Sequence, residues 1–118
     1  MRRFFHLSTC NTCKRIAQEL DLPSEFEKQD IKEEELTVVQ LDALKERAGS
    51  YEALFSRRAK LYKERQLKDE QLDETDYKQL ILEHYTFLKR PVLVVDDAIF
   101  IGNSRKTIDR AKDFLASL

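Results

Sequence analysis

The sequence predicts an α/β fold in which a β-α-β segment, a helical block and a β-β-α segment follow one another along the chain. Two observations predict it: short apolar runs of strand length lie near both ends, and stretches with apolar residues at the spacing of a helix face follow them. The length of 118 residues is enough for one hydrophobic core without disulfide or metal staples. We therefore expect a single domain over residues 1–118, with a helical insert over about residues 33–88.

The first strand and helix carry the strongest chemical signal in the chain. The aromatic run at residues 4–7 predicts a strand, residues 8–9 are turn and capping residues, and apolar residues between 16 and 20 share one helix face. Cys10 and Cys13 lie where the strand period changes to the helical period. This position has a chemical use, because the unpaired N–H groups and the positive dipole end of a helix stabilise a thiolate over a thiol.

The middle of the chain is predicted to be mostly helical after a second strand. Weak alternation predicts that strand at residues 24–31. An apolar stripe and an acidic first turn predict a helix over residues 32–48, which Gly49 would end. Residues 50–73 are less regular and have room for two short helices.

A further amphipathic helix is predicted before the second half of the sheet. It begins near Asp73 or Asp76 and ends by Lys89, because Pro91 disfavours helical backbone at the residue before it. His84 lies on the apolar stripe of this predicted helix, so we expect it in the core.

The last part of the chain predicts a hairpin followed by a helix. The continuous apolar run at residues 92–95 is typical of a strand buried on both faces. Residues 96–97 would turn the chain into a returning strand at residues 98–101. Residues 102–104 then open the last helix.

The charge balance limits the partners that we expect. The 21 Lys and Arg residues nearly cancel the 22 Asp and Glu residues, so the formal net charge is -1. We expect no direct binding to nucleic acid, and any anion must be bound by a local cluster. No apolar stretch approaches the roughly 20 residues that a membrane span needs, so we expect a soluble, cytoplasmic protein without a membrane partner.

The two cysteines favour redox or nucleophilic chemistry over metal binding. Most zinc sites need four ligands, and His6 and His84 are not spaced as partners for Cys10 and Cys13, so we expect no metal. A disulfide that closes such a short loop would stabilise the fold little. In a reducing cytosol, a lone Cys-x-x-Cys is more often a redox or nucleophilic site. The alternative is two incidental thiols, with Cys13 packed against the core.

Cys10 is the stronger candidate for the nucleophile. It falls at the strand–helix junction, where its sulfur can be exposed and close to free N–H donors. Cys13 lies one helical turn further and would be more covered. A thiolate at Cys10 would attack an oxidised substrate, and Cys13 would then attack the mixed species, release the product and leave an internal disulfide.

The order of elements, with a Cys-x-x-Cys after the first strand and a proline opening the third, resembles the thioredoxin fold. The long helical insert is similar to that of the arsenate reductase family and its Spx-type relatives. The resemblance covers essentially the whole chain. The residues that carry it are Cys10-Asn11-Thr12-Cys13, Arg57-Arg58, Leu88-Lys89-Arg90-Pro91-Val92-Leu93-Val94 and Gly102-Asn103-Ser104-Arg105.

The resemblance implies a thiol-dependent oxidoreductase that acts on a small oxyanion, such as arsenate, or on a thiol substrate. In arsenate reductases the first cysteine of the motif is the nucleophile, which corresponds to Cys10. The implied electron donor is glutathione with glutaredoxin, or thioredoxin as a reducing partner protein, and no cofactor is bound. The second position is often Ser in that family, so Cys13 departs from the pattern and is closer to the Spx-type thiol switch.

Three arginines are candidates for binding a tetrahedral oxyanion, because planar guanidinium groups bind its oxygens bidentately. The resemblance places Arg58 (or its neighbour Arg57), Arg90 and Arg105 at the family's arginine positions. It also implies a cis peptide bond before Pro91, against the active-site thiol. We predict a catalytic role for Arg90 and substrate-binding roles for Arg58 and Arg105; the alternative for each is a solvated surface cation.

Asn11 and Thr12, between the two cysteines, and His6 are the other predicted substrate-binding residues. His6 lies four residues before Cys10 and matches a His seen in many arsenate reductases. An imidazolium at this position would lower the pKa of the thiol. An inward position on the strand would instead make His6 a core residue, and both interpretations stay open.

Two hypotheses compete with an enzyme. Spx-type proteins use the same fold and a Cys-x-x-Cys as a redox sensor, and they regulate transcription by binding the alpha subunit of RNA polymerase. The presence of Cys13 favours that alternative. The other hypothesis is a redox-inert domain that keeps the fold as an interaction module.

Overall fold

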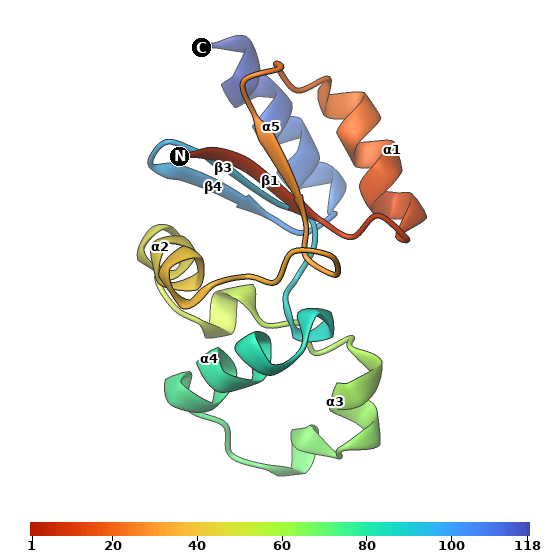
Figure 1. Cartoon of the computed structure of the whole chain (residues 1–118), viewed down its shortest axis with the longest axis vertical. Coiled ribbons are helices and arrows are strands. Elements are labelled where there is room, and N and C mark those ends of the chain that lie inside the picture. Colours follow the sequence, from red (N-terminus) through yellow and green to blue (C-terminus); the bar gives the residue numbers. More distant parts are fainter. The chain divides into compact units, whose positions relative to one another are not determined.

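The computed structural model describes all residues 1–118, and its contacts divide the chain into two compact units, each drawn in Figure 1. The first unit consists of Met1–Glu34 and Arg90–Leu118, and the second of Glu35–Lys89. The second unit nearly coincides with the predicted helical insert of about residues 33–88. A single domain over the whole chain stays a prediction.

The first unit is built on a four-stranded sheet in the order β2-β1-β3-β4. β1 runs parallel to β2 and antiparallel to β3, and β3 and β4 form the predicted hairpin around Asp96 and Asp97. The α/β class and the order of elements are therefore as predicted. The strands are β1 (Arg2–His6), β2 (Glu27–Asp30), β3 (Val92–Val95) and β4 (Ala98–Ile101).

Two helices pack on one face of this sheet. α1 (Asn11–Leu20) connects the parallel strands β1 and β2, α5 (Arg105–Ala116) follows β4, and the two helices lie side by side (Figure 1). Residues directly opposite each other on neighbouring strands point to the same face of a sheet, so the paired residues Phe4 and Leu93 share one face. Burying each large side chain contributes about 1.5–3 kcal/mol to folding. The buried cluster between this face and the helices consists of Phe4, Ile16, Leu20, Phe26, Leu93, Val95, Ile108 and Ala111.

The second unit is helical, as predicted, apart from one isolated bridge between Phe55 and Leu88. The ring of Phe55 stacks on Phe87 with a centroid separation of 5.4 Å and meets Tyr77 at 4.9 Å, so these aromatics form the centre of the unit. Its elements are α2 (Val38–Ala48), η1 (Glu52–Leu54), α3 (Lys60–Glu64), η2 (Leu67–Asp69), α4 (Glu74–Glu83) and η3 (Tyr85–Phe87).

The helix predicted over residues 32–48 begins later, at Val38. Thr37 and Gln40 form a capping box, in which the Thr37 hydroxyl accepts from the Gln40 N–H at 3.0 Å and the Gln40 side chain accepts from the Thr37 N–H at 3.1 Å. This reciprocal cap satisfies free N–H groups of the first turn and fixes the start of the helix. The end at Gly49, with its positive φ of 95°, is as predicted.

The helix predicted to reach Lys89 ends at Glu83, and the second predicted strand is also shorter than expected. His84 adopts an extended conformation, and its Nδ1 accepts a hydrogen bond of 3.0 Å from the Thr86 N–H. His84 is therefore the cap between α4 and η3, rather than a residue on a helical apolar stripe. The strand predicted over residues 24–31 is confined to β2, because a turn precedes it.

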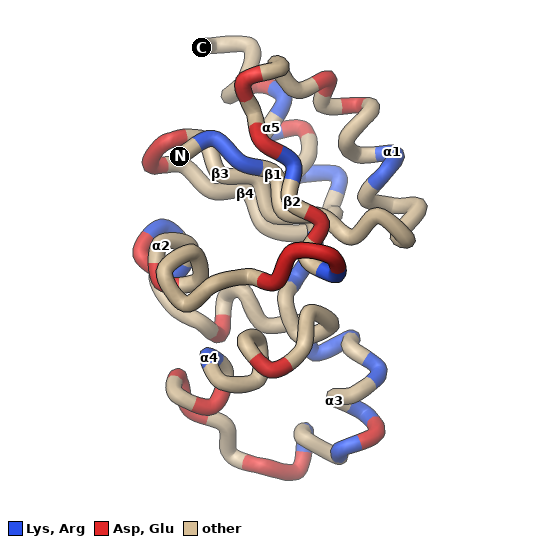
Figure 2. Tube along the Cα trace, in the orientation of Figure 1, with Lys and Arg blue, Asp and Glu red and all other residues tan.

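Charged residues of both signs are spread along both units (Figure 2), so neither unit carries a large net charge of one sign. No helix of the chain combines the length and the apolar character needed to cross a bilayer.

Candidate active site

Cys10 occupies the N-cap position of α1. Its backbone is extended, with φ of −94° and ψ of 114°, its carbonyl accepts from the Lys14 N–H at 3.2 Å, and its N–H donates to the Leu7 carbonyl at 3.0 Å. By strict hydrogen-bond geometry its side chain makes no capping bond, but the N–H groups of Thr12 and Cys13 are close enough to act on the sulfur. The sulfur thus stands where a Ser, Thr or Asp oxygen usually accepts from the first N–H groups of a helix.

The surroundings of Cys10 favour its thiolate. Partial burial on its own raises the pKa of the thiol, but the backbone N–H of Cys13, the Cys13 thiol, the backbone N–H of Thr12 and the positive charge of Arg90 all lower it, and the net pKa lies below its ordinary value. These groups stabilise the negative charge by hydrogen bonds and by Coulomb attraction. The sulfur remains partly exposed, so a thiolate here can meet a substrate.

Cys13 has the opposite character. Its side chain is 1% exposed, and burial raises the pKa of its thiol to about 11, with the neighbouring Cys10 sulfur adding to the rise. Cys13 therefore stays protonated at neutral pH and donates to Cys10. Both cysteines are free thiols in this structure. The pair combines an accessible sulfur that ionises readily with a covered sulfur one turn away.

Arg90 brings a positive charge to both sulfurs, although it is far from them in the sequence. It is half-buried and precedes Pro91 at the start of β3, and the Arg90–Pro91 peptide bond is cis, as the resemblance implies. The pairing of Phe5 with Val92 places this end of β3 beside the strand that leads to Cys10. The charge of Arg90 lowers the pKa of both thiols, so it stabilises whichever sulfur is ionised.

The other predicted residues of the first unit lie close to α1 but differ in exposure. Thr12 supplies a backbone N–H to the Cys10 sulfur, while Asn11 is exposed on the first helical turn. His6 is the last residue of β1, and its ring stacks on Phe4 with a centroid separation of 5.7 Å. Burial lowers the pKa of His6, which favours the neutral ring over an imidazolium. Whether Asn11, Thr12 and His6 bind substrate stays a prediction.

Arg105 is occupied by carboxylates. Its guanidinium binds Glu19, and it also pairs with Asp109 at 2.8 Å. Arg105 lowers the pKa of Glu19 to about 2, and the pair joins α1 to α5. A substrate oxyanion at Arg105 would have to displace one of these carboxylates.

Arg58 and Arg57 belong to the second unit, in the turn before α3. Arg58 is exposed, and Arg57 binds the Glu52 carboxylate at 2.6 Å and the Tyr77 hydroxyl at 2.9 Å. The structure therefore brings together Cys10, Cys13 and Arg90 in the first unit, and the substrate-binding role of Arg58 stays a prediction.

The comparison with known families decides which proteins this chain resembles. The model of the ArsC family matches residues 5–111, which is most of the chain. The chain belongs to the ArsC family. Its fold is therefore thioredoxin-like, as predicted, and the resemblance to arsenate reductases and their relatives is confirmed at the level of the family. No curated protein matches the chain.

Solved structures of ArsC-related proteins have the same fold. An arsenate reductase from Vibrio cholerae has a TM-score of 0.76 and 19% identity, covering 95% of this chain and 95% of its own. A possible arsenate reductase from Streptococcus mutans has a TM-score of 0.70 and 27% identity, covering 89% of this chain and 92% of its own. An arsenate reductase-related protein from Brucella melitensis has a TM-score of 0.70 and 21% identity, covering 92% of each chain.

Asp30 is a residue near the thiol site of this ArsC family chain that sequence analysis missed. The Ser8 hydroxyl and the Ser8 N–H hydrogen-bond to its carboxylate and lower its pKa, and the Lys32 N–H donates to it at 3.1 Å. Asp30 is also opposite His6 in the parallel register. The contact ties the end of β2 to the turn that leads into Cys10. Pairing the carboxyl ends of the two predicted parallel strands could have found it.

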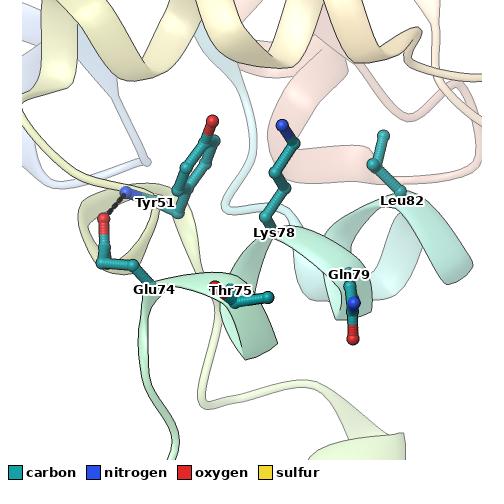
Figure 3. Close-up of a pocket in the computed structure, with 6 residues that line it drawn as sticks. All are labelled: Tyr51, Glu74, Thr75, Lys78, Gln79 and Leu82. Carbon is teal, nitrogen blue, oxygen red and sulfur yellow. Dashed lines mark hydrogen bonds between the residues drawn. The ribbon is translucent and has the colours of Figure 1, made fainter.

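A cleft of about 470 Å³ on the second unit of this ArsC family chain is lined by Tyr51, Glu74 and Lys78 (Figure 3). The Glu74 carboxylate accepts from the Tyr51 N–H at 2.7 Å, and the Tyr51 hydroxyl donates to Asp42 at 2.6 Å. Lys78 pairs with Asp42 at 3.1 Å and lies 5.4 Å from the centre of the Tyr51 ring. The polar groups satisfy one another, so the network holds α2, η1 and α4 together and shows no reactive group.

Proposed function

We propose that this chain is a thiol-dependent oxidoreductase in which Cys10 is the nucleophile and Cys13 the resolving thiol. The single observation that carries the proposal is the contrast between the two sulfurs. Cys10 is partly exposed with a lowered pKa, whereas Cys13 is buried with a pKa raised to about 11. Membership of the ArsC family supports a reductase that works through thiols.

The proposed first step is attack of the Cys10 thiolate on the substrate. With arsenate, a sulfur–arsenic bond forms and one oxygen leaves as water after protonation, so no electrons have moved yet. The charge of Arg90 acts on the Cys10 sulfur, and a guanidinium at this place can also bind the oxygens of a tetrahedral oxyanion. Thr12 and Cys13 contribute backbone N–H groups to the same region.

The proposed second step is attack of Cys13 on the Cys10 sulfur. The sulfur–sulfur bond forms as the sulfur–arsenic bond breaks, and the electron pair of that bond leaves with arsenic as arsenite. Each sulfur is oxidised by one electron, and arsenic is reduced by two. Two external thiol equivalents, from glutathione with glutaredoxin or from thioredoxin, would then reduce the disulfide. In the folded chain the high pKa of Cys13 must fall for this step, and loss of the Cys10 negative charge on forming the adduct removes one cause of that high pKa.

The experiment is turnover of arsenate to arsenite by reduced protein, with matched cysteine variants. Cys10→Ser should abolish the reaction, because no other sulfur is both accessible and ionised. Cys13→Ser should allow the first step and stop there, leaving an arsenic adduct on Cys10 that mass spectrometry detects, or a requirement for glutathione. Full turnover by Cys10→Ser would refute the proposal. If wild type makes no arsenite but Cys10 still exchanges with small disulfides, the substrate is a thiol compound rather than arsenate.

The Spx-type alternative is kept because the chain carries Cys13 where arsenate reductases often have Ser. In that role the Cys10–Cys13 disulfide would be a signal, and the partner would be the alpha subunit of RNA polymerase. Capture of that subunit by oxidised but not reduced protein would select the regulator. Location in the cytoplasm stays a prediction for both roles.

A further inference from the structure

A hollow of about 320 Å³ lies beside Cys13, between α1 and the edge strand β2. Its most buried lining residues are apolar: Phe4 and Cys13 are each 1% exposed, and Ala17 is half-buried. Phe4 comes from β1, and the ring of His6 stacks on it and forms part of the wall. Cys10 does not line the hollow, which therefore differs from the place where the Cys10 sulfur meets the helix amides.

The rim of this hollow is cationic. Lys14 comes from α1, and Lys28 comes from β2, where it pairs with Phe4 in the register. Both lysines are exposed, and none of the ion pairs of the chain includes either of them. The charge of Lys28 acts electrostatically on His6 in the wall of the hollow, as does the opposite charge of Asp30. Two ammonium groups over an apolar floor are complementary to a ligand with one anionic end and one apolar end.

The size of the hollow limits the ligand. A volume of about 320 Å³ is at the lower end of the range for small-molecule sites, so it suits one or two fused rings or a short chain with a single charged group. The side-chain amide of Gln18 at the rim could donate to the same anionic group, whereas the Ser8 hydroxyl already donates to Asp30.

We propose that the hollow between α1 and β2 is a binding site for small carboxylates with an apolar body. Lys14 and Lys28 bind the carboxylate, and Phe4, Cys13 and Ala17 contact the apolar part. This site is additional to the proposed oxidoreductase function and does not depend on it, because its occupant touches neither Cys10 nor Arg90. It gives the chain a means of recognising an acidic organic molecule beside its buried thiol.

The test is titration of the isotope-labelled, reduced chain with 2-naphthoate, followed by amide chemical shifts in NMR spectra. Saturable shifts should be confined to β1, β2 and the residues of α1 from Cys13 to Gln18, with a Kd of about 1 mM. The neutral analogue 2-naphthamide should bind about tenfold more weakly, because it lacks the charge.

Three variants locate the site. Lys14→Gln and Lys28→Gln should each raise the Kd for 2-naphthoate about threefold or more, and together more than tenfold, while Lys106→Gln on α5 is the matched control and should leave it unchanged. All three positions are exposed, so the variants should keep the fold. Cys10→Ser should bind 2-naphthoate as wild type does, which separates this site from the proposed chemistry. Equal binding of 2-naphthamide, unchanged binding by the double lysine variant, or shifts centred elsewhere would overturn the proposal.

Discussion

The buried thiol of Cys13 donates a hydrogen bond to the sulfur of Cys10, one helical turn earlier in the chain, and this contact separates the pKa values of the two groups. Cys10 gains a donor for its negative charge. Cys13 is held protonated mainly by its burial, and its ionisation would also place a second charge beside the first. The same contact thus increases the fraction of Cys10 that is thiolate and helps to keep Cys13 protonated.

Replacing Cys13 tests this contact directly. Cys13→Ala removes the donor and should raise the pKa of Cys10, because water replaces only part of the hydrogen bond to the charged sulfur. Cys13→Ser keeps a donor and should give a smaller rise. The rate of alkylation by iodoacetamide as a function of pH reports the pKa. Identical profiles for wild type and Cys13→Ala would show that the thiol contact does not matter.

Arg90 should act through its charge. Arg90→Gln is expected to raise the pKa of Cys10 and to weaken arsenate binding, whereas Arg90→Lys should restore most of the pKa effect but not bidentate binding. Arg110→Gln, on the exposed side of α5, is the control. The ultraviolet absorbance of the Cys10 thiolate as a function of pH gives the pKa. The KM for arsenate gives the effect on binding. A solvated-surface role for Arg90 would leave both values unchanged.

The pair formed by Glu19 and Arg105 should make stability depend on pH in the acid range. The folded pKa of Glu19 is lowered to about 2, so its ionised form stabilises the fold above the unfolded pKa, and this contribution is lost as the pH falls toward 2. Glu19→Gln should lower the melting temperature at pH 6 by a few degrees at most, since the pair is exposed. The difference from wild type should shrink as the pH approaches 2. Thermal unfolding at several pH values measures this, and a constant difference would contradict it.

His6 should also make the fold less stable as the pH falls, but in a higher pH range than Glu19. Burial is the main cause that lowers its folded pKa, with a smaller contribution from Lys28 and an opposing one from Asp30. The unfolded chain therefore binds more protons just below the ordinary histidine pKa of about 6.5, and stability falls as the pH drops through that value toward the folded pKa. His6→Gln should reduce this loss. His84→Gln is the control, because His84 is the only other histidine.

The ring signals of His6 provide an independent check. Its imidazole protons should titrate below pH 6.5 in NMR spectra of the folded chain, since the neutral ring is favoured. A titration above this value would show an imidazolium at neutral pH and would support the predicted effect of His6 on the Cys10 thiol.

Local sequence determined much of the fold and the position of Cys10 in the site. The β-α-β and β-β-α order, the hairpin turn at Asp96 and Asp97, and the placement of Cys10 at the start of α1 all depend on residues within one element or its neighbour. Strand and helix periods, turn residues and helix-start signals are local properties, so they are visible without a structure. Helix ends were less predictable, because the capping box at Thr37 and the extended His84 override the apolar periodicity.

The contact between Arg90 and the sulfurs depends on tertiary structure, and only the family resemblance, not the local sequence, predicts a catalytic role for Arg90. Arg90 and Cys10 are far apart in the chain, and they meet because β3 pairs antiparallel with β1 in a register that only long-range packing defines. The same is true of Arg105, which sequence placed among the substrate-binding residues and the fold pairs with Glu19. Periodicity shows which face of an element is buried, whereas the distance between two charged groups depends on how those faces pack together.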